Sequence, residues 1–228
     1  MHALDNVIWQ ALTTRQSQFA QSFGEARRFL PEVTALTAFQ EPSAQGFASL
    51  AGLLSPGGTA LLSLANPYKP QPGWELAITF PGLQMVCENV RGEAHEDVRS
   101  TEIIELSQRD SPEMVELAAL TKPGPFGSRT HELGAYFGIR SEGKLVAMAG
   151  ERLKVPGYTE VSAVCTHPKH TGKGYARVLM MEVMRGIWDR GETAFLHVRQ
   201  NNTRAVELYE RLGFRTRVVV HFTVLRKQ

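Results

Sequence analysis

The chain has 228 residues, a formal net charge of +2 and 21% charged residues, values that are ordinary for a globular protein of one large or two small domains. It contains no apolar run near the ~20 residues of a membrane helix, and its first residues lack the basic-then-apolar pattern of a secretion signal. The small net charge gives no indication of nucleic-acid binding. The two cysteines, Cys87 and Cys165, form neither a metal-ligand spacing nor a disulfide framework. We therefore expect a cytoplasmic protein without a membrane segment or a bound metal.

The charge is divided unevenly along the chain. Residues 1–100 carry 6 Lys and Arg against 9 Asp and Glu, whereas residues 101–228 carry 19 against 14. A polar segment, residues 88–101, joins the two parts and is typical of a connection between domains. We predict an N-terminal α/β half, residues 1–97, without an assigned role, and a second domain, residues 98–228. The basic character of the second domain suits an anionic ligand.

In the N-terminal half, the apolar pattern predicts a helix over 44–54 that ends at a Ser-Pro-Gly-Gly sequence. Short strands are predicted at 59–64, 74–79 and 83–87. The second domain begins with a strand at 102–106. A helix follows, with Ser111 as its cap and Pro112 in its first turn. After a Gly/Pro-rich loop, a hairpin is predicted from strands 135–140 and 145–153, because Ser-Glu-Gly-Lys lies between them.

The remaining elements alternate between strand and helix. They are a strand at 160–166, a helix at 174–190, a strand at 193–198, a helix at 202–212 and terminal strands around 215–226. The predicted fold class is therefore a mixed α/β domain.

A glycine-rich turn lies between the strand at 160–166 and the helix that follows it. Residues 171–176 read Thr-Gly-Lys-Gly-Tyr-Ala. Such a turn exposes backbone N–H groups beside the positive end of a helix, which favours a pyrophosphate. A P-loop would need Ser or Thr after Lys173, and a dinucleotide fingerprint would need glycine in place of Arg177. Both alternatives are excluded.

The last helix places an amide and a phenol on one face. Asn202 and Tyr209 are seven residues apart, which leaves their side chains ~20° apart around the helix axis. Ala205 lies between them, and a small residue there would let the helix approach a flat ligand. The alternative is structural: Asn202 as a helix cap and Tyr209 as a core residue.

The two motifs together resemble the GNAT superfamily of acyl-CoA-dependent N-acetyltransferases, in particular its glycine-N-acyltransferase-like branch. The turn matches the family pattern (Gln or Arg, two residues, Gly, one residue, Gly or Ala) everywhere except at Thr171. The resemblance covers a little over half of the chain. It implies a splayed mixed sheet flanked by helices, and it raises the idea that residues 1–97 are a degenerate GNAT-like unit.

The resemblance also implies the site. Acetyl-CoA or another short acyl-CoA would enter between the strands 160–166 and 193–198. The backbone of Val164 and Thr166 would hydrogen-bond its pantetheine arm, which would take the place of an added strand. Tyr209 would be the general acid that protonates the departing thiolate. The implied cofactor-binding residues are Val164, Cys165, Thr166, Thr171, Gly172, Lys173, Gly174, Tyr175, Ala176, Asn202 and Ala205.

A base is also needed, because an alkylammonium of pKa ~10.4 costs ~4.6 kcal/mol to deprotonate at pH 7. Glu160 lies where some GNAT enzymes carry this base. A carboxylate of ordinary pKa is a weak base, so we expect either a water relay or a pKa raised by burial. The alternative is a solvated glutamate at a strand edge. His197 is interpreted as a structural histidine in an apolar strand, and Cys165 as a packing residue.

The resulting functional hypothesis is transfer of an acetyl group from acetyl-CoA to a primary amine in a ternary complex, with a small-molecule amine as acceptor. The loop 123–134 occupies the acceptor-facing position, and Phe126, Arg129 and His131 are its candidate specificity residues. We expect the N-terminal half to shape the acceptor entrance or to form the contact of a homodimer. Two alternatives stay open: a non-catalytic acyl-CoA-binding regulatory module, and an acetyltransferase acting on protein N-termini or lysines.

Overall fold

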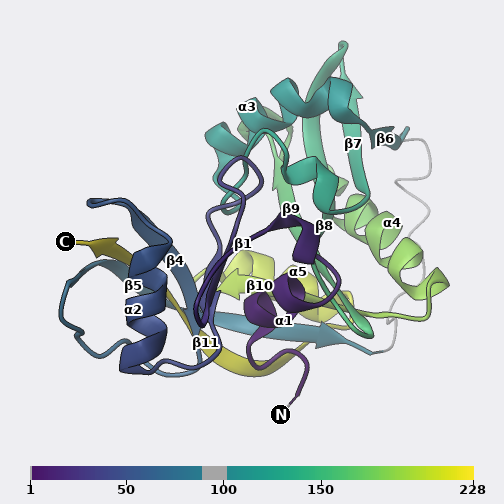
Figure 1. The fold of residues 1–228 in the computed structure, drawn as a ribbon. Coiled ribbons are helices and arrows are strands. Elements are labelled where there is room, and N and C mark those ends of the chain that lie inside the picture. Colours follow the sequence, from purple (N-terminus) through teal and green to yellow (C-terminus); the bar gives the residue numbers. More distant parts are fainter. Residues whose placement is uncertain (1, 89–101) are drawn as a thin grey trace.

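The computed structural model describes residues 2–88 and 102–228. Its centre is an eight-stranded sheet that takes strands from both halves of the sequence (Figure 1). The order across this sheet is β4-β11-β5-β10-β9-β8-β7-β6. The strands are β4 (Thr59–Leu64), β5 (Trp74–Cys87), β6 (Ile104–Leu106), β7 (Tyr136–Ser141), β8 (Lys144–Val155), β9 (Tyr158–Thr166), β10 (Thr193–Arg199) and β11 (Arg215–Lys227).

Strands β9 and β10 form the one parallel pair of the described sheet, and they separate along their length. Their register runs only from Thr193↔Tyr158 to Phe195↔Glu160. Beyond that pair, β9 continues to Thr166 and β10 to Arg199 with no ladder between them. The facing edges therefore leave backbone groups that a ligand can bond.

Strand β9 is also bulged in this region. Its register with β8 shifts between Cys165↔Met148 and Ser162↔Gly150, and Ala163 has a φ of 52°. A non-glycine residue seldom adopts this left-handed conformation. Bulges of this kind redirect side chains and are common beside active sites.

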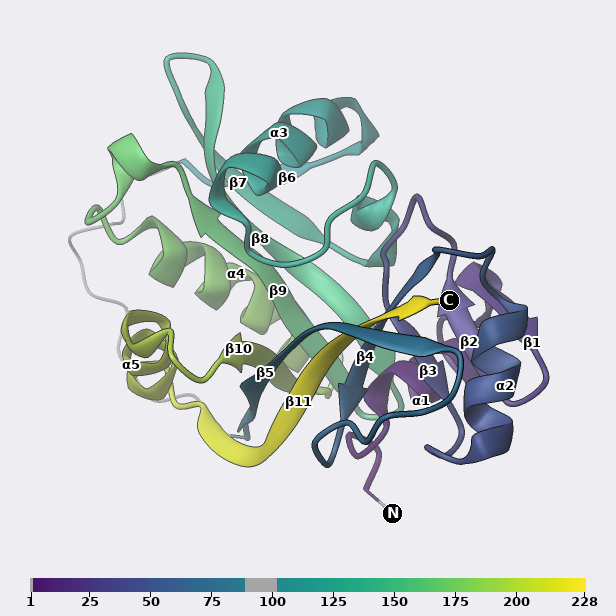
Figure 2. The ribbon, with the colours of Figure 1, turned by 90° about the vertical axis from the view of Figure 1, so that its left-hand side faces the viewer.

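Helices cover both faces of the large sheet (Figure 2). On one face, α4 (Tyr175–Asp189) and α5 (Thr203–Arg211) share a core cluster with Leu196 and Val198 of β10. On the other face, α3 (Ser111–Thr121) packs with β7 to β9, and α1 (Val7–Thr13) packs with Phe195. The alternation of side chains along β10 thus separates an α4/α5 face from an α1/α3 face.

The N-terminal residues add a second sheet of β1 (Ala20–Phe23), β2 (Ala26–Phe29) and β3 (Thr37–Phe39). Helix α2 (Ala44–Gly52) packs beside it, and Phe47 joins Trp74 and Leu225 of the large sheet in one core cluster. The order helix, three antiparallel strands, helix, strand and long strand (α1, β1 to β3, α2, β4, β5) recurs in the second half, where α5 is added before the last strand (α3, β7 to β9, α4, β10, β11). This half is an α/β unit, and its origin as a degenerate copy of the second half stays a prediction.

Strand β5 ties the two halves together. It pairs with β10 on one side and with β11 on the other, and its residues Met85 and Cys87 have no exposed surface. The predicted boundary between residues 97 and 98 lies outside the described residues, as does nearly all of the predicted connecting segment. The division into two domains therefore stays a prediction, and the sheet itself is shared by both parts.

The predicted break within β5 is wrong. Residues 74–79 and 83–87 belong to a single strand that runs through Pro81 and Gly82. The Pro81 carbonyl accepts a hydrogen bond from the Gln200 amide, on the side of β5 that faces β10. In an antiparallel sheet the N–H and C=O of one residue point to the same side. The N–H that proline lacks is therefore on the β10 side, and the ladder with β11 is not interrupted. A side chain at Gly82 would meet the Phe222 ring at 2.4 Å, which explains the glycine.

The other predicted elements agree with the structure within a few residues at their ends. The hairpin of β7 and β8 turns at Glu142 and Gly143, both with positive φ (51° and 78°). The start of α3 differs by one position: Ser111 is its first residue rather than its cap, and the Ser111 hydroxyl donates to the Ser128 carbonyl. Residues 1–43 carried no prediction, and those of them that the structure describes form α1 and the three-stranded sheet.

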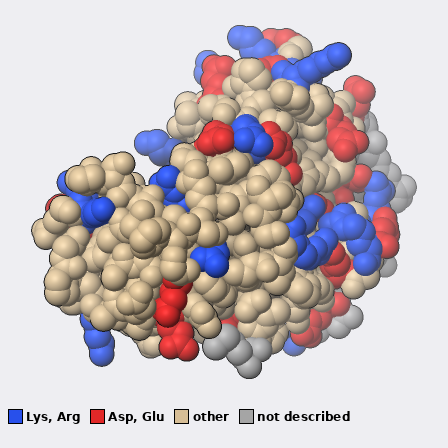
Figure 3. All heavy atoms as spheres, in the orientation of Figure 1, with Lys and Arg blue, Asp and Glu red and all other residues tan. Residues whose placement is uncertain are grey.

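On the face shown in Figure 3, acidic and basic side chains are interspersed. Within residues 2–88 and 102–228, no helix is both long and apolar enough to cross a membrane. The same residues contain no group of three His, Cys, Asp or Glu side chains that could hold a metal ion.

Candidate active site

The glycine-rich turn forms the start of α4. Gly172 and Gly174 have φ values of 82° and 76°, and Gly174 is the residue before the helix. The first helical bond runs from the Val178 amide to the Gly174 carbonyl, and none of the side chains that the structure describes caps this end. The amides of Tyr175 and Ala176 therefore have no helical acceptor. They can bond an anion at the positive end of the helix.

A cavity of about 350 Å³ lies beside this turn. Its walls come from the end of β9, the turn, the start of α4 and one face of α5. All eleven predicted cofactor-binding residues line it, and so does Tyr209. Sequence reasoning missed five further lining residues: His170, Arg177, Arg204, Leu208 and Arg211.

The cavity suits a nucleotide-bearing thioester in three respects. A Cβ added at Gly172 would meet no atom within 4 Å, so the turn is open to a ligand. Arginines 204 and 211 add positive charge to the wall. The edge of β9 beyond Glu160 is not paired with β10, so the backbone of Val164 and Thr166 faces the cavity side.

Tyr209 is buried in the α4/α5 core, with 9% of its surface exposed. Burial raises the pKa of its phenol to about 12. Its ring packs near Phe214, with the ring centroids 6.1 Å apart. None of the described hydrogen bonds uses the Tyr209 hydroxyl. The group is a neutral donor at the cavity wall.

Asn202 combines the two interpretations that the sequence left open. Its side-chain oxygen accepts a bond from the Ala205 amide at 3.3 Å, so it caps α5. It also lines the cavity together with Ala205. Its side-chain amide nitrogen forms none of the described hydrogen bonds and can donate to a ligand.

Glu160 lies on the opposite, α1/α3 face and does not line this cavity. It is fully buried. Arg152 binds its two oxygens through Nε at 2.9 Å and Nη2 at 2.7 Å, and the Leu153 amide donates to it at 3.3 Å. His197 Nδ1 lies 2.7 Å from its Oε1 atom. The expectation of a solvated or raised-pKa carboxylate is wrong: burial alone would raise the pKa, but Arg152 and His197 lower it to about 2.

The sequence predicts a purely structural role for His197, but the structure places it in direct contact with the predicted base. Its Nε2 atom lies 3.1 Å from Gln84 Nε2, which also donates to the Leu4 carbonyl, while Gln84 Oε1 accepts from Arg217. These partners fix the orientation of the Gln84 side-chain amide, with its NH₂ group toward His197. The Nε2 atom of His197 therefore accepts a hydrogen bond from Gln84, and its Nδ1–H donates to Glu160. The sequence could not reveal this contact, because it depends on the pairing of β10 with both β9 and β5.

The predicted acceptor-facing loop lies over this buried pair. Phe126 packs edge-on against Tyr136, with centroids 5.8 Å apart, and Gly124 approaches the Arg152 guanidinium. The N-terminal half holds the loop, because the Arg129 amide donates to the Glu32 carbonyl at 2.9 Å. The Arg129 side chain pairs with Glu32 and Glu132. His131 Nδ1 is buried without a hydrogen-bond partner among residues 2–88 and 102–228.

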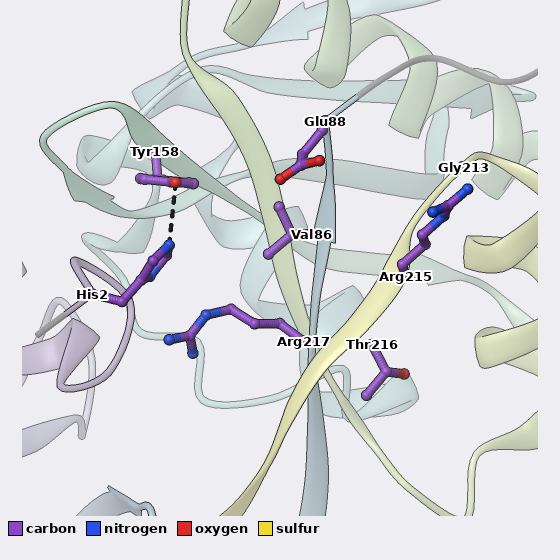
Figure 4. Close-up of a pocket in the computed structure, with 8 residues that line it drawn as sticks. All are labelled: His2, Val86, Glu88, Tyr158, Gly213, Arg215, Thr216 and Arg217. Carbon is purple, nitrogen blue, oxygen red and sulfur yellow. Dashed lines mark hydrogen bonds between the residues drawn. The ribbon is translucent and has the colours of Figure 1, made fainter.

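A second cavity of about 350 Å³ lies near the start of β9 (Figure 4). Its walls include Arg215 and Arg217 of β11, and His2, which contacts the Tyr158 hydroxyl at 3.3 Å. No predicted site residue lines it. Arg217 is already bonded to Gln84 and Asp5. The predicted cofactor-binding residues and Tyr209 therefore gather at the cavity beside the glycine turn and not at this one.

Comparisons with known proteins agree with this geometry. A family model described as FR47-like protein matches residues 136–223. The N-alpha-acetyltransferase RimI of Mycobacterium tuberculosis (strain ATCC 25618 / H37Rv) is 33% identical over 129 residues, which are 52% of this chain and 80% of that protein. A solved GNAT-family protein from Novosphingobium aromaticivorans DSM 12444 is similar over 100% of both chains, with 36% identity and a TM-score of 0.90.

A GCN5-related N-acetyltransferase from Kribbella flavida shares the fold over 98% of this chain and 95% of its own, with 16% identity and a TM-score of 0.67. The chain belongs to the GNAT superfamily of N-acetyltransferases. The predicted family and fold class are thereby confirmed, and the general reaction is acyl transfer from an acyl-CoA to an amine.

Proposed function

We propose that this protein transfers an acetyl group from acetyl-CoA to the primary amine of a small molecule, by direct attack in a ternary complex. The observation that carries the proposal is the cavity in which the open amides of the glycine turn, the unpaired edge of β9 and the Tyr209 phenol converge. A regulatory module that only binds acyl-CoA would not need a buried, unbonded phenol at the same cavity.

The proposed binding roles follow from the positions of the lining residues. The amides of Tyr175 and Ala176 bond the pyrophosphate, with Lys173 adding charge. The backbone of Val164 and Thr166 bonds the pantetheine arm in the manner of an added strand. Asn202 donates its side-chain amide to the same arm. Acetyl-CoA supplies the activated acetyl group.

Tyr209 is proposed to donate its proton to the sulfur atom that leaves. A phenol of pKa about 12 facing a thiol of ordinary pKa ~8.5 makes this transfer uphill by ~3.5 units, or roughly 5 kcal/mol. The same burial raises the pKa of a thiol next to Tyr209 and narrows the difference. A preorganised hydrogen bond contributes the rest.

Glu160 is proposed to orient His197 rather than to act as a direct base. Its oxygens are occupied by Arg152, the Leu153 amide and His197, and its low pKa makes it a weak proton acceptor. The Glu160 bond to Nδ1–H and the Gln84 bond to Nε2 leave His197 no free acceptor nitrogen in the described structure, so we propose that a water takes the proton of the amine. Tyr209 and the Glu160–His197 pair lie on opposite faces of the sheet, which would keep the general acid apart from this network.

The test is a measurement of acetyl-CoA binding by thermal shift and calorimetry, followed by thiol release across a panel of amines. A ligand specific for the folded state raises the melting temperature. Gly174→Val should abolish the shift, because both φ and the open turn are lost. Gly191→Val is the matched control: Gly191 has a similar φ of 69° with open space around it, but it lies at the other end of α4.

Wild-type protein without a thermal shift or calorimetric heat at millimolar acetyl-CoA would overturn the proposal. Binding of acetyl-CoA without thiol release for any amine would favour the alternative function, a non-catalytic acyl-CoA-binding regulatory module.

A second candidate function is acetylation of a peptide N-terminus. The observation that favours it is the 33% identity to a protein named N-alpha-acetyltransferase RimI. Including short peptides with free and blocked N-termini in the same panel decides between the two acceptor classes.

A further inference from the structure

Tyr136 presents a buried hydroxyl that has no hydrogen-bond partner among the described residues. The residue is 1% exposed. Leaving a buried donor unbonded is costly, whereas replacing it with an apolar group of the same shape is nearly neutral or stabilising. The hydroxyl is therefore not explained by the stability of the protein alone.

The ring of Tyr136 is directed from β7 across β8 toward β9. Tyr136 is paired with Gly150 of β8, and a Cβ at Gly150 would meet the ring at 2.3 Å. The ring therefore lies flat over the glycine. Ala163, within the bulge of β9, and Cys165, directly after it, share the core cluster of Tyr136. The hydroxyl thus reaches the bulged part of β9, on the α1/α3 face.

The surroundings favour a partner that accepts a hydrogen bond. Burial raises the pKa of Tyr136, so it stays protonated and can donate. Arg152 lowers this pKa whereas the Glu160 and Glu151 carboxylates raise it, so the charges near the hydroxyl are of both signs. The nearby Glu160 carboxylate is already bonded by other groups. Phe126 of the acceptor-facing loop covers the ring from above.

We propose that the Tyr136 hydroxyl donates a hydrogen bond to a carbonyl oxygen adjacent to the acceptor's amine. This deepens and rests on the proposed acetyltransferase function. It assigns the acceptor to the class of α-amino acyl compounds, such as amino acid amides and peptide N-termini. A simple alkylamine would leave the hydroxyl unbonded.

The test compares wild type with Tyr136→Phe on two amines of matched shape, alaninamide and isopropylamine, which differ in the carbonyl group. A neutral hydrogen bond is worth about three- to tenfold in affinity. We expect KM for alaninamide to rise by about that factor with kcat within twofold, and KM for isopropylamine to stay unchanged. The melting temperature should stay equal or rise.

Tyr158→Phe is the control, because it makes the same chemical change at the second cavity (Figure 4), where the hydroxyl contacts His2. It should change neither KM. Calorimetry of alaninamide with protein and CoA gives a readout that does not depend on turnover, and the Phe variant should bind it about three- to tenfold more weakly.

Three results would overturn the inference. The first is an unchanged alaninamide KM and affinity in Tyr136→Phe. The second is an equal rise for both amines, which would show that the hydroxyl does not read the carbonyl. The third is a clear fall in melting temperature, which would reveal a structural partner. Failure of the acetyltransferase proposal itself is distinguishable, because it appears as absent thiol release in wild type with every amine.

Discussion

The two faces of the gap between β9 and β10 are built on different principles. The α4/α5 face offers backbone amides, a small alanine and one phenol around an open cavity. The α1/α3 face holds a buried carboxylate, guanidinium and imidazole in a closed network that reaches β5. The first face can bind any ligand with the common nucleotide and pantetheine parts. The second depends on both halves of the chain, and we propose that specificity for the acceptor lies there.

The strongest test of this contrast is removal of residues 1–97. The α1/α3 face and the centre of the sheet would lose β5, which lies between β10 and β11 and buries Met85 and Cys87 completely. We expect the fragment 98–228 to lose cooperative folding, measured by thermal melting and amide NMR dispersion. Coexpression with residues 1–88 should restore the fold. A folded fragment that binds acetyl-CoA unaided would show that the two faces are independent.

The next effect concerns the α4/α5 face alone. Tyr209→Phe keeps the ring in its core cluster and removes the proton donor. General acid catalysis is typically worth ~10²–10⁴ in rate, so turnover should fall by that factor while acetyl-CoA affinity stays unchanged. Equal losses in turnover and affinity would mean that the hydroxyl only binds the cofactor. Turnover within about threefold of wild type, with chemistry limiting the rate, would remove Tyr209 from the mechanism.

On the α1/α3 face, Glu160→Gln should cost stability as well as activity. Removing one partner of a buried ion pair leaves Arg152 uncompensated, typically at about 3–5 kcal/mol. The pH dependence has a defined sign. The pKa of Glu160 is lowered from near 4.5 to about 2, so its contribution is fully present above pH 4.5 and is lost as the pH falls toward 2.

Urea unfolding of wild type and Glu160→Gln between pH 7 and pH 2 measures this effect. The stability difference should be largest at neutral pH and shrink at low pH. Glu182→Gln is the control, because Glu182 pairs with Arg185, which is 66% exposed, and such surface pairs contribute ~0–1 kcal/mol. A constant difference across the pH range would mean that Glu160 is not held as a carboxylate.

The sequence was informative where the signal is local. Turn residues predicted the β7–β8 hairpin, and the spacing from Asn202 to Tyr209 predicted a shared helix face at one cavity. The glycine turn was found for the same reason. What could not be predicted depends on pairing between distant strands: the insertion of β5 beside β10, and the meeting of Glu160 with His197.

Residues 1–43 show why short elements escape detection. Helix α1 has 7 residues, and β1 to β3 have 4, 4 and 3, too few for a helical or alternating pattern to stand out. The Pro81-Gly82 pair predicted a break that does not exist, because the side of Pro81 that lacks an N–H faces the end of β10 and leaves the ladder with β11 intact.

The smallest expected effect tests the departure at Thr171 from the pattern of the resembled family. The Thr171 hydroxyl donates to the Pro168 carbonyl at 3.1 Å and so serves the turn itself. Thr171→Arg should strengthen acetyl-CoA binding by about two- to fivefold, since one exposed charge near an anion contributes roughly 0.5–1 kcal/mol.

Thr171→Gln distinguishes the effect of charge from that of hydrogen bonding, because glutamine adds a hydrogen-bond donor without a charge. Calorimetry at low and high salt should show a gain for Arg that salt removes and a smaller, salt-independent gain for Gln. If both variants bind acetyl-CoA more weakly than wild type, the expectation is wrong. The hydrogen bond from Thr171 to the Pro168 carbonyl would then be what holds the turn in its binding conformation, and threonine would be the residue that suits this position.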